Sequence, residues 1–217
     1  MITAIIPARQ GSKGLPGKNL REFHGQTLLA RAIGTAQEAG SRVIVSTDGA
    51  EIAAEAARCG AEVLMRPADL ATDTATTWAV VRHVLAEAEV SRSDPVAIVQ
   101  CTNPFCTPGD VQRCAIAETG ADLAVCVQAT HDLLLDEDGS PINWGFDQTQ
   151  RQARGAQYRL TGSVWAFSAA YCQQRELYEG WITPVVAELP IQRDIDTLQD
   201  LEEAAALWPL VQPCLKP

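Results

Sequence analysis

The stretch that decides the fold is residues 5–19, IIPARQGSKGLPGKN. It starts inside an apolar strand candidate at residues 3–6 and runs through a glycine-rich loop toward a helical pattern at residues 28–39. Open α/β sheets bind ligands at the carboxyl ends of their strands. The stretch therefore predicts a strand, a ligand-binding loop and a helix, in that order.

Short apolar runs and amphipathic helical windows alternate outward from this stretch. Further strands are expected at residues 42–46, 62–65, 96–100, 122–127, 159–167 and 185–189, and further helices at residues 50–58, 74–89, 108–119 and 198–207. Glycine just past several of these helices is the expected stop signal. The alternation predicts a single α/β domain over residues 1–217, Rossmann-like, with a mostly parallel sheet covered by helices on both faces.

The regular pattern stops between residues 128 and 157. This polar segment contains the turn sequence Asp136-Glu137-Asp138-Gly139. We expect an inserted hairpin or arm over residues 128–157, acting either as a dimerisation element or as a lid over the substrate.

The 217 residues carry 17 Lys and Arg against 27 Asp and Glu, a net charge of −10. A chain of this size can bury a full core without disulfides or a structural metal. Its acidity argues against nucleic acid as a partner, because binding the phosphate backbone needs a broad basic face. No run approaches the roughly 18 apolar residues of a membrane span, and the seven cysteines form no C-x-x-C pair. We therefore expect a soluble, cytoplasmic protein with reduced thiols and no membrane contact.

The positive charge of the glycine-rich loop is unusual for this acidic chain. Only three lysines exist, and two of them, Lys13 and Lys18, lie five residues apart in the loop, with Arg9 nearby. The three loop glycines let the backbone approach a ligand and turn amide groups toward it. The spacing fits neither the Walker A loop nor the dinucleotide fingerprint. We interpret the loop as a phosphate-binding site; the alternative is a flexible, solvated loop with chance charges.

Polar residues also follow the other strand candidates. Arg66 ends the third strand, where it would face the same crevice as the loop. Gln100 ends the fourth, where its amide would read a base edge or orient a reacting group. The hydroxyls at residues 74–77 begin a helix and are either caps or ligand contacts, and Thr47 or Asp48 is expected to cap the helix at residues 50–58.

The sequence Asp194-Ile195-Asp196 is the most informative acidic feature. Alternation along an extended segment points both carboxylates to one side. Mg²⁺ is commonly bound in proteins by one or two carboxylates together with substrate phosphates. We therefore predict Mg²⁺ as the cofactor, held by Asp194 and Asp196. A compatible role is that Asp196 or Thr197 caps the last helix, with charge from Asp200 in its first turn.

Together these segments resemble a known family. IIPARQGSKGLPGKN, VSTDGAEIA, GAEVLMRPADLATDTATT, QCTNP, RLTGSVWAF and DIDTLQDLEEA, in this order and spacing, are similar to the acylneuraminate cytidylyltransferases, or CMP-sialic acid synthetases. The similarity spans nearly the whole chain. It implies the fold of the nucleotide-diphospho-sugar transferases. It also implies a Mg²⁺-dependent reaction in which CTP and sialic acid or a related nonulosonic acid give a CMP-sugar and pyrophosphate.

The resemblance also implies roles for individual residues. Those implied to bind the nucleotide are Ala8, Arg9, Gly11, Ser12, Lys13, Lys18, Asn19, Arg66, Thr77 and Gln100. Arg9, Lys18 and Asp196 would be the catalytic residues, and Asp194 and Asp196 the metal ligands. Those implied to bind the acid are Arg151, Tyr158 and Arg159. The family analogy and the polarity of the arm together lead us to expect a homodimer.

The chain departs from the family on the acceptor side. Cys101, Asn103 and Cys106 stand where the family often has proline, serine and arginine, and the arm has no lysine. These changes bear on the identity of the acid more than on the nucleotide chemistry. The alternatives are a cytidylyltransferase for another small acid, either an octulosonic acid or a phosphonate, a GTP-using relative, and a nucleotide-binding protein without catalysis.

Overall fold

The structure, a computed structural model, describes residues 1–143 and 157–215. Residues 144–156 and 216–217 lie outside the described residues, and Arg151 with them. Seven strands of the described chain form one sheet in the order β5-β4-β1-β6-β8-β7-β9. In chain order these strands are β1 (Thr3–Pro7), β4 (Arg42–Thr47), β5 (Glu62–Met65), β6 (Pro95–Val99), β7 (Leu123–Thr130), β8 (Gln157–Ser168) and β9 (Ile182–Val186).

Most neighbours in this sheet are parallel. β1 pairs in parallel with β4 and β6, β4 with β5, and β7 with β9, whereas β8 runs antiparallel to both β6 and β7. The mostly parallel, Rossmann-like α/β class predicted from the sequence is confirmed. Because parallel strands end at the same edge of a sheet, the segments that follow β1, β4, β5 and β6 meet there.

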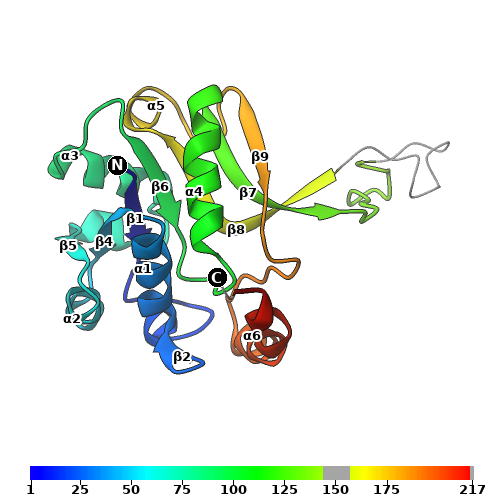
Figure 1. Ribbon diagram of the computed structural model, residues 1–217, viewed down its shortest axis with the longest axis horizontal. Helices are drawn as coiled ribbons and strands as arrows, with labels where there is room; N and C mark the ends of the chain where they lie inside the picture. Colours follow the sequence, from blue (N-terminus) through cyan, green and yellow to red (C-terminus); the bar gives the residue numbers. More distant parts are fainter. Residues whose placement is uncertain (144–156, 216–217) are drawn as a thin grey trace.

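Helices cover both faces of the sheet (Figure 1). In β1, Ala4 and Ile6 belong to one buried cluster and Ile5 between them to another, because successive strand side chains point to opposite faces. The first cluster includes α1 (Leu28–Glu38), α2 (Ala50–Arg58), α4 (Pro108–Ala117) and α6 (Leu198–Val211). The second includes α3 (Thr77–Glu87) and α5 (Ala169–Gln174).

Local sequence signals explain where several helices begin and end. Gly40, past the end of α1, has a φ of 78°, a left-handed conformation that glycine adopts without strain. Thr107 and Thr197 begin α4 and α6 with capping boxes that Asp110 and Asp200 complete. The cap expected at Asp196 or Thr197 is therefore made by Thr197.

Other termini differ from the sequence prediction. α6 continues beyond residue 207 and through Pro209, because Trp208 and Val211 are buried in the core. β9 begins at Ile182 rather than at residue 185. The sequence pattern also does not indicate α5 or the short hairpin of β2 (Glu22–Phe23) and β3 (Gln26–Thr27).

The expected caps of α2 are wrong. Its N-cap residue is Gly49, which makes no side-chain hydrogen bond to the helix. The hydroxyl of Thr47 accepts from the amide of Gly49 at 3.1 Å. Asp48 turns instead toward the glycine-rich loop, where its Oδ1 accepts from the backbone N–H of Gln10 at 2.9 Å.

The segment expected as an arm, residues 128–157, starts and ends inside strands. Residues 128–130 belong to β7 and Gln157 belongs to β8, where they pair. Between residues 131 and 143 the chain leaves the sheet, and Leu135 and Pro141 form an antiparallel bridge around the expected turn. Figure 1 shows this segment standing away from the body of the molecule. The described part of the arm is therefore residues 131–143.

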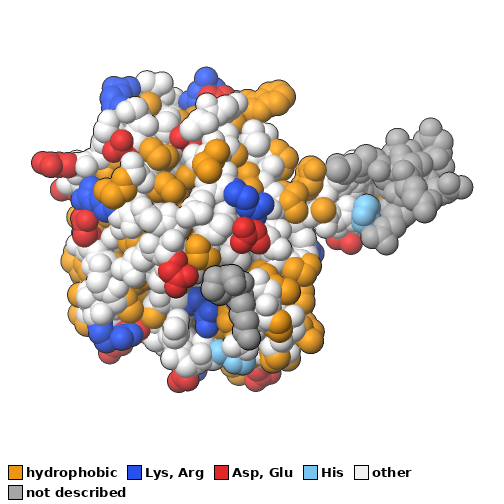
Figure 2. Space-filling model, in the orientation of Figure 1, with side chains coloured by type: hydrophobic (Ala, Val, Ile, Leu, Met, Phe, Trp, Pro, Cys, Tyr) orange, Lys and Arg blue, Asp and Glu red, His pale blue; other side chains and the backbone are white. Residues whose placement is uncertain are grey.

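Two surface properties follow from the described residues. None of their helices is both long and apolar enough to cross a membrane. On the face shown in Figure 2, basic and acidic side chains are interspersed, and no broad basic area is present on that face.

Candidate active site

A cavity of about 480 Å³ lies at the edge of the sheet where β1, β5 and β6 end. The predicted site residues that line it are Arg9, Ser12, Lys13, Lys18, Asn19, Arg66, Thr77, Gln100 and Asp196. Ala8 and Gly11 do not line it; Ala8 is fully buried, and its amide donates to the carbonyl of Ser46 at 2.9 Å. The structure thus brings most of the predicted nucleotide residues together in one hollow.

The glycine-rich loop packs directly on the segment that carries the two aspartates. A Cβ added at Gly14 would overlap the backbone oxygen of Asp196, so this close approach requires glycine. Gly17 has a φ of 66° and precedes the short 3₁₀ turn of residues 18–20. Asn19 is buried, and its Nδ2 donates to the carbonyl of Arg9 at 2.9 Å, which closes the loop on itself.

The cations of the loop are paired with carboxylates from two other segments. Lys18 Nζ lies 2.9 Å from Asp196 Oδ1, and the Lys18 side chain is only 13% exposed. Arg9 Nη1 and Lys13 Nζ each lie 2.6 Å from an oxygen of Asp73, in the segment that leads into α3. The loop is therefore joined electrostatically to both sides of the cavity.

Arg66 differs from the other cations because it has no carboxylate partner within ion-pair distance among the described residues. It is 9% exposed, and its Nη2 donates to the carbonyl of Ser46. Its Nε is buried without a hydrogen-bond partner in the described structure. Burial lowers the pKa of the guanidinium, but an arginine stays charged at neutral pH. A buried, under-partnered cation on the cavity wall favours an anionic ligand.

Thr77 and Gln100 complete the wall. The helix cap of α3 is Thr76, whose hydroxyl accepts from the amide of Ala79 at 3.1 Å, so Thr77 is the first helical residue and lines the cavity. Gln100 follows β6; its backbone N–H donates to Ser163 at 3.0 Å, and its side chain is half-buried at the wall.

The two predicted metal ligands lie on either side of a buried residue, Ile195. Asp196 lines the cavity, whereas Asp194 lines a smaller hollow of about 230 Å³ beside β8. Desolvation raises the pKa of Asp194, and the charge of Asp196 adds to the rise, while a hydrogen bond from Thr102 and the charge of Lys18 oppose it. The carboxylates are thus near enough to influence each other electrostatically.

The donor set fits Mg²⁺ in one mode of binding. Within residues 1–143 and 157–215, no group of three or more His, Cys, Asp or Glu side chains forms a metal cage. Mg²⁺ does not need one, because it is usually held by one or two carboxylates plus substrate phosphates. Asp194 and Asp196 are carboxylates of this kind, but Asp196 lines the cationic cavity, paired with Lys18, whereas Asp194 lines the smaller hollow.

Arg159 lies in the smaller hollow with Asp194. It faces Gln128 across the β7–β8 pair, and its Nη2 donates to Gln128 Oε1 at 2.7 Å. Tyr158, one residue earlier on β8, does not line this hollow, whereas Leu160 and Thr161, which follow Arg159, do. The structure therefore brings Arg159, but not Tyr158, next to Asp194.

The three residues that differ from the family pattern are buried and are not exposed to the cavity or to the smaller hollow. Cys101, Asn103 and Cys106 are all buried, and none lines the cavity or the smaller hollow. Asn103 Nδ2 donates to the carbonyl of Thr161 at 2.8 Å, so it ties the segment after β6 to β8. Burial raises the pKa of the Cys101 thiol to about 12.

Asp73 and Gln128 line the two hollows, and Asp48 contacts the loop, but none of them is predicted from the sequence as a site residue. Each acts through a partner distant in the sequence, such as Arg9 and Lys13 for Asp73. Asp73 lies 64 positions from Arg9, so no local signal indicates their pairing.

A larger hollow of about 770 Å³ runs along α1 and contains none of the predicted site residues. Of its cations, Arg58 contacts Glu55 at 2.7 Å, and the Arg31 guanidinium lies 4.3 Å from the ring centroid of Trp208. Arg31 Nε, like Arg66 Nε, is buried without a hydrogen-bond partner in the described structure. The cavity at the strand ends is the better candidate site because the loop cations, Arg66 and Asp196 converge there.

A family model described as "Cytidylyltransferase" matches residues 3–134, which is more than half of the chain. The matched stretch includes the glycine-rich loop, Arg66, Thr77 and Gln100. It ends before β8 and the two aspartates.

Two curated proteins illustrate the relationship. The chain is 42% identical over 106 residues to N-acylneuraminate cytidylyltransferase from Escherichia coli O18:K1:H7, a match that covers 48% of this chain and 25% of that protein. It is 35% identical over 230 residues to 3-deoxy-manno-octulosonate cytidylyltransferase from Serratia proteamaculans, covering 94% of this chain and 85% of that protein. The chain thus spans about a quarter of the first relative and most of the second.

A solved structure shares the fold. CMP:2-keto-3-deoxy-manno-octonic acid synthetase, determined in complex with CTP, aligns over 96% of this chain and 98% of its own with a TM-score of 0.70. Its sequence identity is 16%, so this likeness bears on the fold alone.

Proposed function

The chain belongs to the cytidylyltransferase family, and we propose that it joins CTP to an acidic sugar, sialic acid or a related nonulosonic acid. The products are a CMP-sugar and pyrophosphate. The observation that carries the proposal is the 480 Å³ cavity, where loop cations, Arg66 and Asp196 converge at the strand ends.

The main task of such a site is to stabilise charge. The acceptor hydroxyl attacks the α-phosphorus of CTP in line with the leaving group, and negative charge grows on the pyrophosphate oxygen as the bond breaks. In this proposal Lys18, Arg9 and the loop amides bind that oxygen and its phosphates. Lys18 suits the role because its largely buried side chain strengthens electrostatic contacts.

The remaining cavity residues bind the CMP portion. Arg66 contributes donors to the α-phosphate or to the cytidine, and Gln100 offers an amide for the base edge. Thr77 adds a hydroxyl at the start of α3. These groups hold the α-phosphorus in place for attack and lower the entropic part of the barrier.

Mg²⁺ remains part of the proposal, with Asp194 and Asp196 as its protein ligands. When bound, the ion supplies positive charge that polarises phosphoryl oxygens. In the protein itself, Lys18 holds Asp196 in place through their 2.9 Å ion pair. None of the three histidines lines the cavity or the smaller hollow, so no histidine is proposed as the general base.

The acid is proposed to occupy the smaller hollow, with its carboxylate on Arg159. The guanidinium is held there by Gln128 and lies beside the same Asp194. Tyr158 and Arg151 stay in the proposal as acceptor contacts, although Tyr158 does not line this hollow.

An octulosonic acid is the second candidate acceptor. The relative named for that acid matches 94% of the chain, whereas the one named for N-acylneuraminate matches 48% but at higher identity. The N-acylneuraminate relative favours a nonulosonic acid by identity and the octulosonate relative favours an octulosonic acid by coverage, so an activity assay must identify the acceptor.

The test is pyrophosphate release from CTP with a panel of acids: N-acetylneuraminic acid, a legionaminic acid, an octulosonic acid and a phosphonate. We expect release with a nonulosonic acid, dependence on Mg²⁺, and no release with GTP. The Lys18→Met variant is the inactive control. Pyrophosphate release with the octulosonic acid alone would show that this acid, and not a nonulosonic acid, is the acceptor. CTP binding without pyrophosphate release on any acid would overturn the enzymatic proposal.

A homodimer formed through the arm is proposed as well, in a cytoplasmic setting that suits the seven free thiols. In the described part of the arm, Leu133, Leu134, Leu135 and Ile142 are exposed. A run of exposed apolar side chains is typical of an interface. Analytical ultracentrifugation should give a dimer for the wild type and a monomer for Leu134→Asp/Ile142→Asp; a monomeric wild type would remove this part of the proposal.

A further inference from the structure

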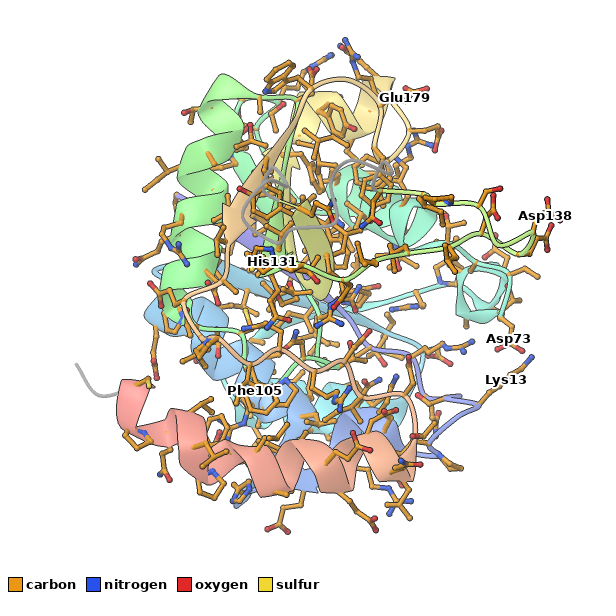
Figure 3. The ribbon with its side chains drawn as sticks, turned by 90° about the vertical axis from the view of Figure 1, so that its right-hand side faces the viewer. Lys13, Asp73, Phe105, His131, Asp138 and Glu179 are labelled. Atoms are coloured by element: carbon orange, nitrogen blue, oxygen red, sulfur yellow. The ribbon has the colours of Figure 1, made fainter. Side chains whose placement is uncertain are left out.

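Asp73 forms ion pairs with two cations of the glycine-rich loop at once. These two, Arg9 and Lys13, are called the outer cations. Its Oδ1 lies 2.6 Å from Arg9 Nη1 and its Oδ2 lies 2.6 Å from Lys13 Nζ. Figure 3 shows Asp73 and Lys13 meeting at the outer end of the loop. One carboxylate thereby bridges Arg9, assigned above to the leaving pyrophosphate, and Lys13, one of the predicted nucleotide-binding residues.

The position of Asp73 suits a mobile counter-anion. It lies between the 3₁₀ turn of residues 68–71 and α3, in a segment whose Thr72, Asp73 and Ala75 line the cavity. The Asp73 side chain is 43% exposed and Lys13 is 75% exposed, so water competes with both ion pairs. Hydrogen bonds from Lys13 and then Arg9 lower the pKa of Asp73, so it is a carboxylate at neutral pH.

The other two cations of the cavity, Lys18 and Arg66, are called the inner cations and have different partners. Lys18 pairs with Asp196, and Arg66 donates to backbone carbonyls. Neither contacts Asp73. An anion that needs only Lys18 and Arg66 can bind while the Asp73 bridge stays intact, whereas an anion that needs Arg9 and Lys13 has to displace it or lie beside a like charge.

We propose that Asp73 is an internal anion that competes with pyrophosphate for Arg9 and Lys13 and so sets how tightly the outer phosphates are held. The inference rests on the proposed function, which assigns Arg9 to the leaving group, and it extends that role to Lys13, the other cation of the Asp73 bridge. After the transfer step, the returning carboxylate takes over the cations that pyrophosphate leaves. Asp73 thereby weakens the binding of triphosphate and pyrophosphate and favours product release, without touching the CMP portion.

The test is isothermal titration of pyrophosphate and of CMP into wild-type protein, Asp73→Asn and Asp69→Asn. Asp69 is an exposed carboxylate on the same segment that does not line the cavity, so it is the matched control for a change of net charge. We expect Asp73→Asn to bind pyrophosphate about fivefold tighter, the scale of partly exposed ion pairs. CMP binding should change by less than about twofold, and Asp69→Asn should match the wild type for both ligands.

The outcomes separate this inference from the proposed function. Unchanged or weaker pyrophosphate binding by Asp73→Asn would overturn the inference, because the residue would then be idle or would position the loop. Equal tightening of CMP, or equal tightening by Asp69→Asn, would also overturn it, since the effect would be one of general charge. A wild-type protein that binds neither CMP nor pyrophosphate would overturn the proposed function together with the inference.

Discussion

The two halves of the sheet present their functional residues in different ways. The nucleotide half consists of β1, β4, β5 and β6, which are parallel and end at one edge, where the 480 Å³ cavity lies. The acceptor half consists of β7, β8 and β9, in which β8 runs antiparallel to its neighbours and the smaller hollow lies beside it.

The site side chains of the two halves come from different parts of their strands. In the nucleotide half, topology alone carries every strand end to the same edge, so Arg66 and Gln100 reach one cavity from separate strands. In the acceptor half, Arg159 sits within a strand rather than at a strand end, and it lines the smaller hollow together with Leu160 and Thr161 of the same strand.

The largest expected effect belongs to the nucleotide half. Lys18→Met should lower kcat about a hundredfold or more, because a partly enclosed cation would no longer stabilise the leaving group. Asp196→Asn should cause a similar loss. Steady-state pyrophosphate release measures both, with thermal melting to verify that the fold is intact.

Lys13→Met is the matched control within the same loop. Because its side chain is 75% exposed, its loss should stay within about tenfold. Equal losses of kcat in Lys18→Met and Lys13→Met would show that inner and outer cations do not differ in their contribution. Near-wild-type turnover by Lys18→Met would contradict the role of the loop in stabilising the leaving group.

The next effect tests the contact between the loop and the aspartate segment. Gly14→Ala should weaken CTP binding by about tenfold or more, because the added Cβ would overlap the backbone of Asp196 and push the loop away. Gly11→Ala is the control, since nothing lies within 4 Å of a Cβ at that position. The comparison is made by titrating CTP; indistinguishable affinities for the two variants would show that the close approach does not matter for binding.

A smaller and more selective effect is expected in the acceptor half. Arg159→Met should raise the KM for the acid about tenfold and leave the KM for CTP within twofold, because one charge-assisted contact is lost outside the nucleotide cavity. Arg92→Met is the control, because Arg92 is exposed and lines neither the cavity nor the smaller hollow. Initial rates at varied acid and varied CTP concentrations give both constants. A rise in the KM for CTP would show that Arg159 also contributes to CTP binding, which would contradict two separate sites.

The smallest effect concerns Cys101, which adjoins the cavity residue Gln100. Its thiol is buried and its pKa is raised to about 12, so almost no thiolate forms near neutral pH. A thiol reagent should therefore modify the exposed Cys214 first and leave kcat within about twofold of the untreated enzyme. Rapid inactivation that tracks modification of Cys101 would disprove the burial of that side chain.

Much of the nucleotide half could be predicted from the sequence. Strands, glycine stops and a charged loop are local signals, and the parallel arrangement then brings Lys18 and Arg66 into one cavity. What local signals do not carry is pairing over long distances. Asp48 binds the loop rather than capping α2, and Asp73 reaches Arg9 across 64 positions.

The acceptor half was harder for the same reason. β9 is shifted relative to its apolar pattern, because its pairing with β7 rather than its own sequence sets its ends. The partnership of Gln128 with Arg159 depends on β-strand register, which a single sequence does not reveal. Arg151, which falls outside the described residues, stays a prediction.

The division between the two halves is tested by titration of CTP with Mg²⁺ into the wild type, Lys18→Met and Arg159→Met. We expect measurable binding to the wild type, at least tenfold weaker binding to Lys18→Met, and unchanged binding to Arg159→Met, because the loop and not β8 is proposed to hold the triphosphate. Equal affinity in all three proteins, or weaker binding to Arg159→Met alone, would contradict this division.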